Sequence, residues 1–197
     1  VNNDFISGQT ALSATPDDTD EFLVSDAGTI KRVDYSLIKG GGITMAQQWR
    51  LSADFTGNAD PIASNLEIVD TYGYGTLGSD MTESSGVFTF PSTGYYLIMA
   101  HHFIKNTNFE RGATMNLNVT TDGSNFNNAG QSIASVSPSS SANTSNTSIM
   151  KYILDVTDTS THKVSFSVNV VTTGSTKTAG DTNFSETTFT FIRLGDT

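Results

Sequence analysis

The segment from residue 86 to residue 104, GVFTFPSTGYYLIMAHHFI, constrains the fold of this chain more than any other. Side chains of an extended chain alternate between two faces, so Phe88 and Phe90 point the same way. Pro91 ends this first strand because it has no N–H to donate to a neighbouring strand. Gly94, which is free to adopt a positive φ, then lets the chain turn. The segment therefore predicts two β-strands joined by a tight connection.

The second of these strands, residues 95–104, stays apolar on both faces. One face carries Tyr95, Leu97, Met99, His101 and Phe103, and the other carries Tyr96, Ile98, Ala100, His102 and Ile104. A strand that is covered on one side only has polar residues at every second position. We therefore expect one face to fill the core of a β-sandwich and the other to meet a second subunit. The candidate residues of this subunit interface are Tyr96, Ile98, His102 and Ile104.

Further segments of the chain alternate apolar and polar residues with a period of two, which is typical of strands. Abundant Ser and Thr with scarce Lys and Glu also favour strands and turns over helices. No long helix is predicted, so the sequence indicates an all-β sandwich or jelly roll. The side chains expected to face inward are Met115, Leu117, Val119, Met150, Tyr152, Leu154, Val156, Val164, Phe166, Val168 and Val170.

Three stretches with turn-forming or polar residues are predicted to be loops: residues 72–78, 135–148 and 174–180. Binding residues of a β-sandwich commonly lie on its end loops, and the 135–148 stretch is the longest and most polar of the three. It is either a ligand-binding loop or a plain connection. The candidate ligand residues are Pro138, Ser139, Ser140, Ser141, Asn143 and Asn146.

Residues 1–42 are expected to form a separate small module. Two short strands, residues 22–26 and 29–33, flank a tight turn, and one helical turn follows at residues 35–38. Such a hairpin is too small to be stable by itself, so it needs a partner, and three copies around an axis would serve. The glycines at 40–42 form a flexible linker to the second domain, residues 43–197.

The central segment resembles the signature of the C1q/tumour-necrosis-factor superfamily. The end of the chain is similar to the last core strand of such domains, and the resemblance covers roughly residues 46–197. It implies a ten-stranded jelly roll that assembles as a trimer. The residues that carry the resemblance are Phe88, Phe90, Pro91, Gly94, Tyr95, Tyr96 and Ile98 in the centre, and Phe189, Phe191, Ile192 and Leu194 at the end.

Residues 20–38, DEFLVSDAGTIKRVDYSLI, are similar to short modules of fibre and appendage proteins of tailed bacteriophages. This resemblance implies a non-enzymatic virion protein, a homotrimer whose N-terminal module binds other virion proteins. Its C-terminal head would bind a glycan or a protein of the host surface. A capsid-decorating head fibre and a secreted bacterial binding protein of C1q type are the alternatives.

Charge and residue content argue against several other functions. The net charge is −10, with 13 acidic and 4 basic side chains up to Glu83 and 7 and 6 after it, so no basic surface for nucleic acid is expected. No apolar run is long enough for membrane insertion, and the chain has no cysteine. The adjacent His101 and His102 point to opposite faces of a strand and cannot chelate one metal within a subunit, although three copies could meet on a threefold axis. We expect no catalytic site, no cofactor and no metal.

Overall fold

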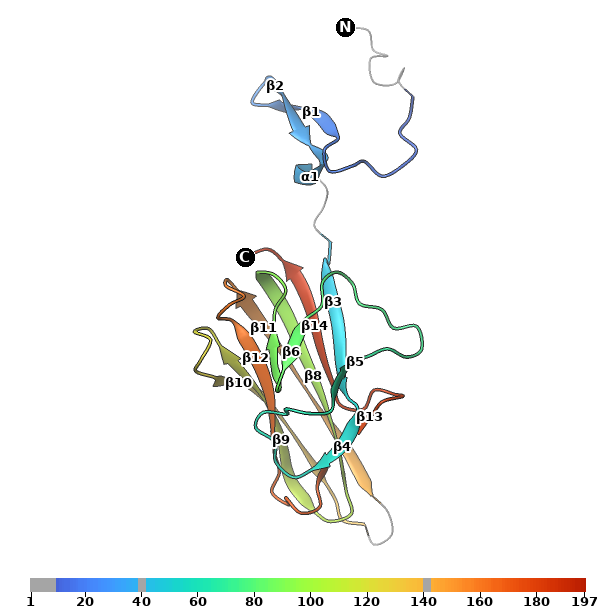
Figure 1. Cartoon of the computed structure of the whole chain (residues 1–197), viewed down its shortest axis with the longest axis vertical. Helices are drawn as coiled ribbons and strands as arrows, with labels where there is room; N and C mark the ends of the chain where they lie inside the picture. Colours follow the sequence, from blue (N-terminus) through green and yellow to red (C-terminus); the bar gives the residue numbers. More distant parts are fainter. Residues whose placement is uncertain (1–9, 39–41, 140–142) are drawn as a thin grey trace. The chain divides into compact units, whose positions relative to one another are not determined.

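The computed structural model describes residues 10–38, 42–139 and 143–197 (Figure 1). The chain divides into two compact units, Val1–Gly41 and Gly42–Thr197. The expected linker falls at this division, but its residues 40 and 41 lie outside the described residues.

The described part of the first unit is a hairpin followed by a single helical turn. Strands β1 (Glu21–Asp26) and β2 (Thr29–Asp34) pair antiparallel, and α1 (Tyr35–Ile38) follows directly. The rings of Phe22 and Tyr35 lie 5.9 Å apart between centroids, and Arg32 forms an exposed ion pair with Glu21 at 2.6 Å. None of the side chains described in this unit is buried. The hairpin predicted from the sequence is present, and it has no core of its own.

The second unit is a sandwich of two antiparallel sheets (Figure 1). The five-stranded sheet has the order β10-β9-β12-β7-β6, and the seven-stranded sheet has the order β4-β13-β8-β14-β3-β5, with β11 paired to β8. The strands of the first sheet are β6 (Thr82–Ser84), β7 (Val87–Thr89), β9 (Glu110–Thr120), β10 (Asn127–Val136) and β12 (Lys163–Asn169). Those of the second are β3 (Met45–Leu51), β4 (Ala53–Thr56), β5 (Leu66–Ile68), β8 (Gly94–Asn106), β11 (Thr144–Val156), β13 (Lys177–Asp181) and β14 (Thr188–Gly195).

Aromatic side chains from both sheets form the centre of the core. Phe88 packs edge-on against Trp49 at 5.3 Å between centroids, and the ring of Phe166 lies 4.3 Å from that of Phe189. Aromatic pairs of this kind stabilise a core beyond the area that they bury. The predicted inward positions are confirmed, because all of them are buried except Tyr152, which is partly buried against the same core.

The predicted orientation of β8 is corrected by the structure. Tyr96, Ile98, His102 and Ile104 were assigned to a subunit interface, but each is at most 1% exposed and lies inside the sandwich of one protomer. They face the five-stranded sheet, as their neighbours Phe189 and Phe191 on β14 do. A second subunit cannot reach these four side chains, so the face available to it is the opposite one.

Two of the predicted loops are largely strand. Residues 144–148 belong to β11 and pair with residues 102–106 of β8, and β10 extends through Val136, which leaves only 137–143 as the connection. Residues 177–181, placed partly in a loop, form β13 between β4 and β8. The predicted loop at 72–78 contains no strand. In the two corrected cases backbone pairing with a long neighbouring strand outweighs a polar local composition.

A buried arginine fastens a loop over one end of the seven-stranded sheet. Arg50 is fully buried and forms ion pairs with Glu67 and Asp70, both at 2.7 Å. Its Nη1 donates to the hydroxyl of Thr71 at 2.9 Å. Its Nη2, which bonds Asp70, also donates to the carbonyl of Thr182. A buried guanidinium needs partners for its donors, and this set supplies them. The segment 67–71 therefore covers the outward side of β3.

Candidate functional site

The outward side of strands β11, β8 and β14 forms a continuous, largely apolar surface, which we call the open face. Residues that are directly opposite in neighbouring strands share a face of a sheet. Leu97 is opposite Ile153 on one side and Ile192 on the other, and His101 is opposite Ile149. The side chains of the open face are Tyr95, Leu97, Met99, His101 and Phe103 on β8, Ile149, Lys151 and Ile153 on β11, and Thr190 and Ile192 on β14.

Two isoleucines stand out on this surface. Ile149 and Ile153 are 61% and 60% exposed, and Tyr95 is 42% exposed. Isolated exposed apolar side chains are ordinary, but a row of them across three paired strands marks an interaction surface. At its β14 end the face continues into a depression of about 240 Å³ beside Tyr74, lined also by Gln48, Thr190 and Ile192.

The two adjacent histidines occupy opposite sides of β8, as predicted. His101 lies on the open face, where its Nδ1 donates to the carbonyl of Glu186 at 2.7 Å. His102 is buried in the sandwich, with Nε2 3.1 Å from the hydroxyl of Thr178 and with no partner for Nδ1 in the described part of the chain. Burial, assisted by the nearby His101, lowers the pKa of His102 from 6.5 to about 4. His102 is therefore a neutral core residue at neutral pH.

The predicted ligand loop is smaller than the sequence suggested. Pro138 and Asn143 are exposed, and the backbone N–H of Ser139 donates to the carbonyl of Thr107 at 3.0 Å. Asn146 belongs to β11, and its side-chain amide donates to the carbonyl of Ser135 at 2.7 Å. Ser140 and Ser141 lie outside the described residues. Of the six candidates, Asn146 therefore serves to fasten β11 to β10.

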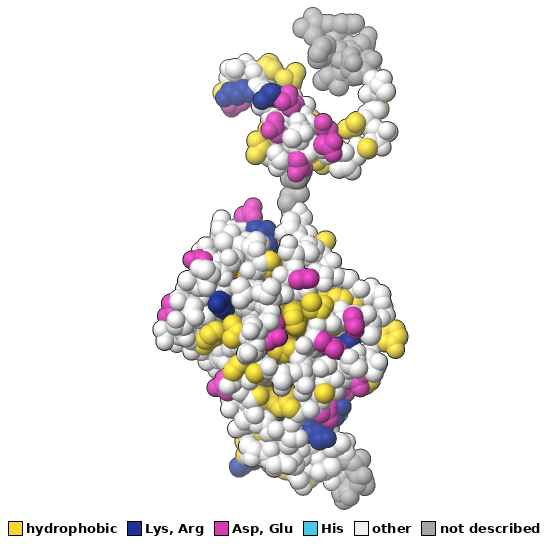
Figure 2. Space-filling view, in the orientation of Figure 1, with side chains coloured by type: hydrophobic (Ala, Val, Ile, Leu, Met, Phe, Trp, Pro, Cys, Tyr) yellow, Lys and Arg dark blue, Asp and Glu magenta, His cyan; other side chains and the backbone are white. Residues whose placement is uncertain are grey.

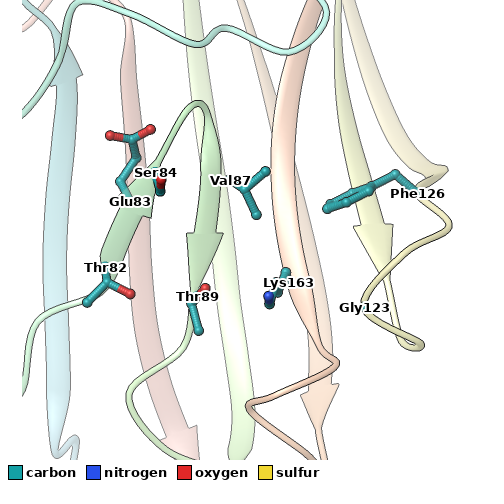
Figure 3. Close-up of a pocket in the computed structure, with 8 residues that line it drawn as sticks. All are labelled: Thr82, Glu83, Ser84, Val87, Thr89, Gly123, Phe126 and Lys163. Carbon is teal, nitrogen blue, oxygen red and sulfur yellow. The ribbon is translucent and has the colours of Figure 1, made fainter.

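A groove on the five-stranded sheet has no counterpart among the predicted sites. It consists of two adjoining depressions, of about 340 Å³ and 250 Å³, that share Val87 and Phe126 (Figure 3). The larger lies over β6, β7 and the start of β12, and the smaller is bounded by residues 60–61. Its remaining lining side chains are Thr82, Glu83, Ser84, Thr89 and Lys163 in the first depression and Asp60, Pro61, Asn118 and Ser165 in the second.

The surface of the second unit carries few charges. On the face of the second unit drawn in Figure 2, Lys and Arg lie only at scattered points, and Asp and Glu lie at several others. Within the described ranges, no three His, Asp or Glu side chains lie close enough together to hold a metal ion. No helix in those ranges has the length and apolar content needed to cross a membrane.

Two antiparallel sheets with this strand order define the second unit as a jelly roll of the C1q/tumour-necrosis-factor type. Three solved structures show the same fold over most of their length. Eiger TNF from S. frugiperda aligns with a TM-score of 0.55 at 10% identity, covering 79% of this chain and 96% of its own. Murine APRIL aligns with TM-scores of 0.51 at pH 5.0 and 0.50 at pH 8.5, at 9% and 12% identity, each covering 76% of this chain and 98% of its own.

At such low identity these similarities establish the fold and nothing of the function. No protein-family profile matches the sequence, and no curated protein matches it either. The jelly-roll fold predicted from the central segment is thus confirmed.

Proposed function

We propose that this chain is a non-enzymatic structural protein of a tailed-phage virion, a trimeric fibre or appendage. Its first unit anchors it to other virion proteins, and its jelly-roll head contacts the host surface. The observation that carries this proposal is the division of the chain into a head with a full core and a small unit in which none of the described side chains is buried. A segment that buries no side chain of its own needs a partner to supply the apolar surface for its stability.

The first unit has the side chains for such a contact. Leu23, Ile30 and Leu37 are all more than three-fifths exposed, on β1, β2 and α1 respectively. Exposed apolar side chains on a hairpin this small favour docking against another protein surface. Together with the resemblance of residues 20–38 to fibre and appendage modules, this supports an anchoring role in a virion.

The open face supports the trimeric part of the proposal, with two further copies of this chain as its occupants. Obligate interfaces of homo-oligomers are more apolar than ordinary protein surface and commonly bury about 2,000 Å² or more. The open face offers an apolar row on the long strands β8 and β11, 13 residues each. The family resemblance of the central segment implies assembly of three such heads.

Removal of residues 1–42 tests the anchoring role. The shortened protein should remain a folded trimer, because the head holds its own core and the open face is intact. Added to particles that lack the full-length protein, it should fail to incorporate. Sedimentation of purified particles followed by immunoblotting measures this.

A point variant tests the apolar contact of the hairpin without removal of residues 1–42. Leu23→Asp in the full chain should also prevent incorporation, since it places a charge on the exposed apolar side of the hairpin. Leu77→Asp makes the same change at an exposed leucine of the head and should incorporate normally. Normal incorporation of the shortened protein would remove the anchoring role and with it the main support for a virion function.

A further inference from the structure

We propose that the groove beside Phe126 binds a neutral saccharide. This inference rests on the proposed function in one respect, namely that the head is the part that meets the host surface. The site differs from the 137–143 loop and from the open face, since it lies on the outward side of the five-stranded sheet (Figure 3).

The floor of the groove is built on paired strands. Thr82, Thr89 and Lys163 are directly opposite one another across β6, β7 and β12. A second row across the same three strands is formed by Ser84, Val87 and Ser165, in which Val87 is opposite both serines. Two cross-strand rows, four of whose six side chains are Ser or Thr, thus lie side by side on regular secondary structure, where their positions are fixed before a ligand arrives. Sites on strands lose less conformational entropy on binding than sites on loops.

Phe126 forms the aromatic wall where the two depressions meet. It lies just before β10, in the turn after β9, and its side chain is 39% exposed and borders both depressions. Figure 3 shows the ring standing beside β12 on the side away from β6. The C–H groups on one face of a pyranose ring pack against such an aromatic face, while the hydroxyl groups around its rim remain free to form hydrogen bonds. Volumes of about 340 Å³ and 250 Å³ are of the size of small-ligand sites.

The polar groups of the groove are available to a ligand. Further along the same face, the side chains of Asn116, Asn118, Asn128 and Ser167 hydrogen-bond to one another at 2.8–3.3 Å. By contrast, within the residues that the structure describes, the lining groups that form no side-chain hydrogen bond and no ion pair are Asp60, Thr82, Ser84, Thr89, Lys163 and Ser165. A ligand with many hydroxyl groups can use such a mixed set of donors and acceptors, whereas an apolar ligand would leave them unsatisfied.

The charge of the groove decides between neutral and acidic sugars. Lys163 contributes one positive charge, and Glu83 and Asp60 contribute two negative charges, on a chain with a net charge of −10. The carboxylate of Glu83 also accepts a hydrogen bond from the backbone N–H of Gly86 at 2.5 Å. Sugars with carboxylate, sulfate or phosphate groups would be repelled, so the ligand is neutral.

Binding to a single groove would be weak, because the groove is shallow and each hydrogen bond exchanges for one with water. Three heads in one particle-bound trimer, and many trimers on a particle, raise the avidity by a factor of about 10²–10⁴ without any new contact. The trimer is therefore the form in which the site would act.

The test uses the full-length protein on a printed array of neutral and acidic oligosaccharides, with the strongest neutral hit titrated by NMR. Phe126→Ala should weaken that binding about tenfold, and Phe126→Trp should preserve it because an aromatic face remains. Phe184→Ala removes a phenylalanine that is 56% exposed elsewhere on the head and should leave binding unchanged. Backbone signals of Lys163 and Thr89 should shift on titration. All three variants replace partly exposed side chains, so the fold should be preserved, as circular dichroism can check.

Several outcomes would overturn the inference. The first is binding of acidic glycans only. The second is glycan binding that Phe126→Ala does not weaken. The third is glycan binding that is lost when a Gly-Ser bridge replaces residues 138–145 but is retained in Phe126→Ala. Unchanged adsorption to host cells whose surface sugars have been oxidised with periodate would point to a protein receptor and equally reject it. If no glycan binds while the protein is a trimer and incorporates into particles, this inference falls and the proposed function stands. If the protein binds the glycan but does not incorporate into particles, the proposed virion function falls and the saccharide site stands.

Discussion

Ile153→Asp should convert the proposed trimer into folded monomers. Ile153 is 60% exposed in the protomer, so a carboxylate at this position remains hydrated in the free head and does not disturb its core. In a trimer built on the open face the same carboxylate would be buried against apolar side chains of a neighbouring copy. Burial of an unpaired charge costs several kcal/mol. This cost should exceed the free energy that the contact between two protomers contributes to assembly.

Sedimentation velocity at micromolar concentration measures this effect, and two variants serve as controls. Ile133 on β10 is 57% exposed on the other sheet, so Ile133→Asp should remain trimeric. Ile98 is in the core, so Ile98→Asp should unfold or aggregate and not yield a clean monomer. A monomeric unmutated protein, or a trimeric Ile153→Asp protein, would contradict the assignment of the open face.

Much of the sandwich could be predicted from the sequence because its strands are covered on one side. In β9 and β12 the alternation of Met115, Leu117, Phe166 and Val168 with polar residues determines which side chains face the core. When one face of a strand is buried and the other is exposed, apolar and polar residues alternate with a period of two, and this period can be read from the sequence alone. The turn before β8 could be predicted for a different reason, since Gly94 adopts a φ of 140° that other residues rarely adopt.

The orientation of β8 could not be predicted, because its two faces have nearly the same composition. Tyr95 and Tyr96, Leu97 and Ile98, and His101 and His102 are pairs in which neither member indicates the core. The decision comes from partners far away in the chain, Phe189 and Phe191 on β14, which meet Ala100 and Ile98 and continue their inward row. A local pattern cannot contain that pairing.

The sites were harder to predict than the fold, for a related reason. The groove combines residues as far apart in sequence as Asp60 and Ser165, and Phe126 follows a polar turn with no motif around it. Arg50 sits in β3, and nothing in the sequence around it indicates that Glu67, on β5, and Asp70, just after β5, will be its partners. Residues 144–148 illustrate the opposite error, since a Ser- and Thr-rich segment becomes a strand when β8 offers it a full row of backbone partners.

Acid should destabilise this protein in the range where His102 titrates. The unfolded chain binds a proton at this histidine below pH 6.5, but the folded chain does so only below about pH 4. Because the unfolded state binds more protons between these values, the free energy of unfolding falls as the pH falls through this window and is constant above it. The loss should reach about 2 kcal/mol by pH 5 and about 3 kcal/mol by pH 4.

Denaturant unfolding at one fixed protein concentration between pH 7 and pH 5 measures this dependence. His102→Gln should abolish most of it, since glutamine can bond Thr178 but cannot take up a proton. His101→Gln should preserve most of it, because burial is the first cause of the low pKa and the charge of His101 only the second. Glu110, whose pKa is lowered from 4.5 by hydrogen bonds that outweigh its burial, loses its contribution only below that value, so it does not interfere at pH 5 and above. If the slope survives in His102→Gln, the buried histidine is not its source and the prediction is contradicted.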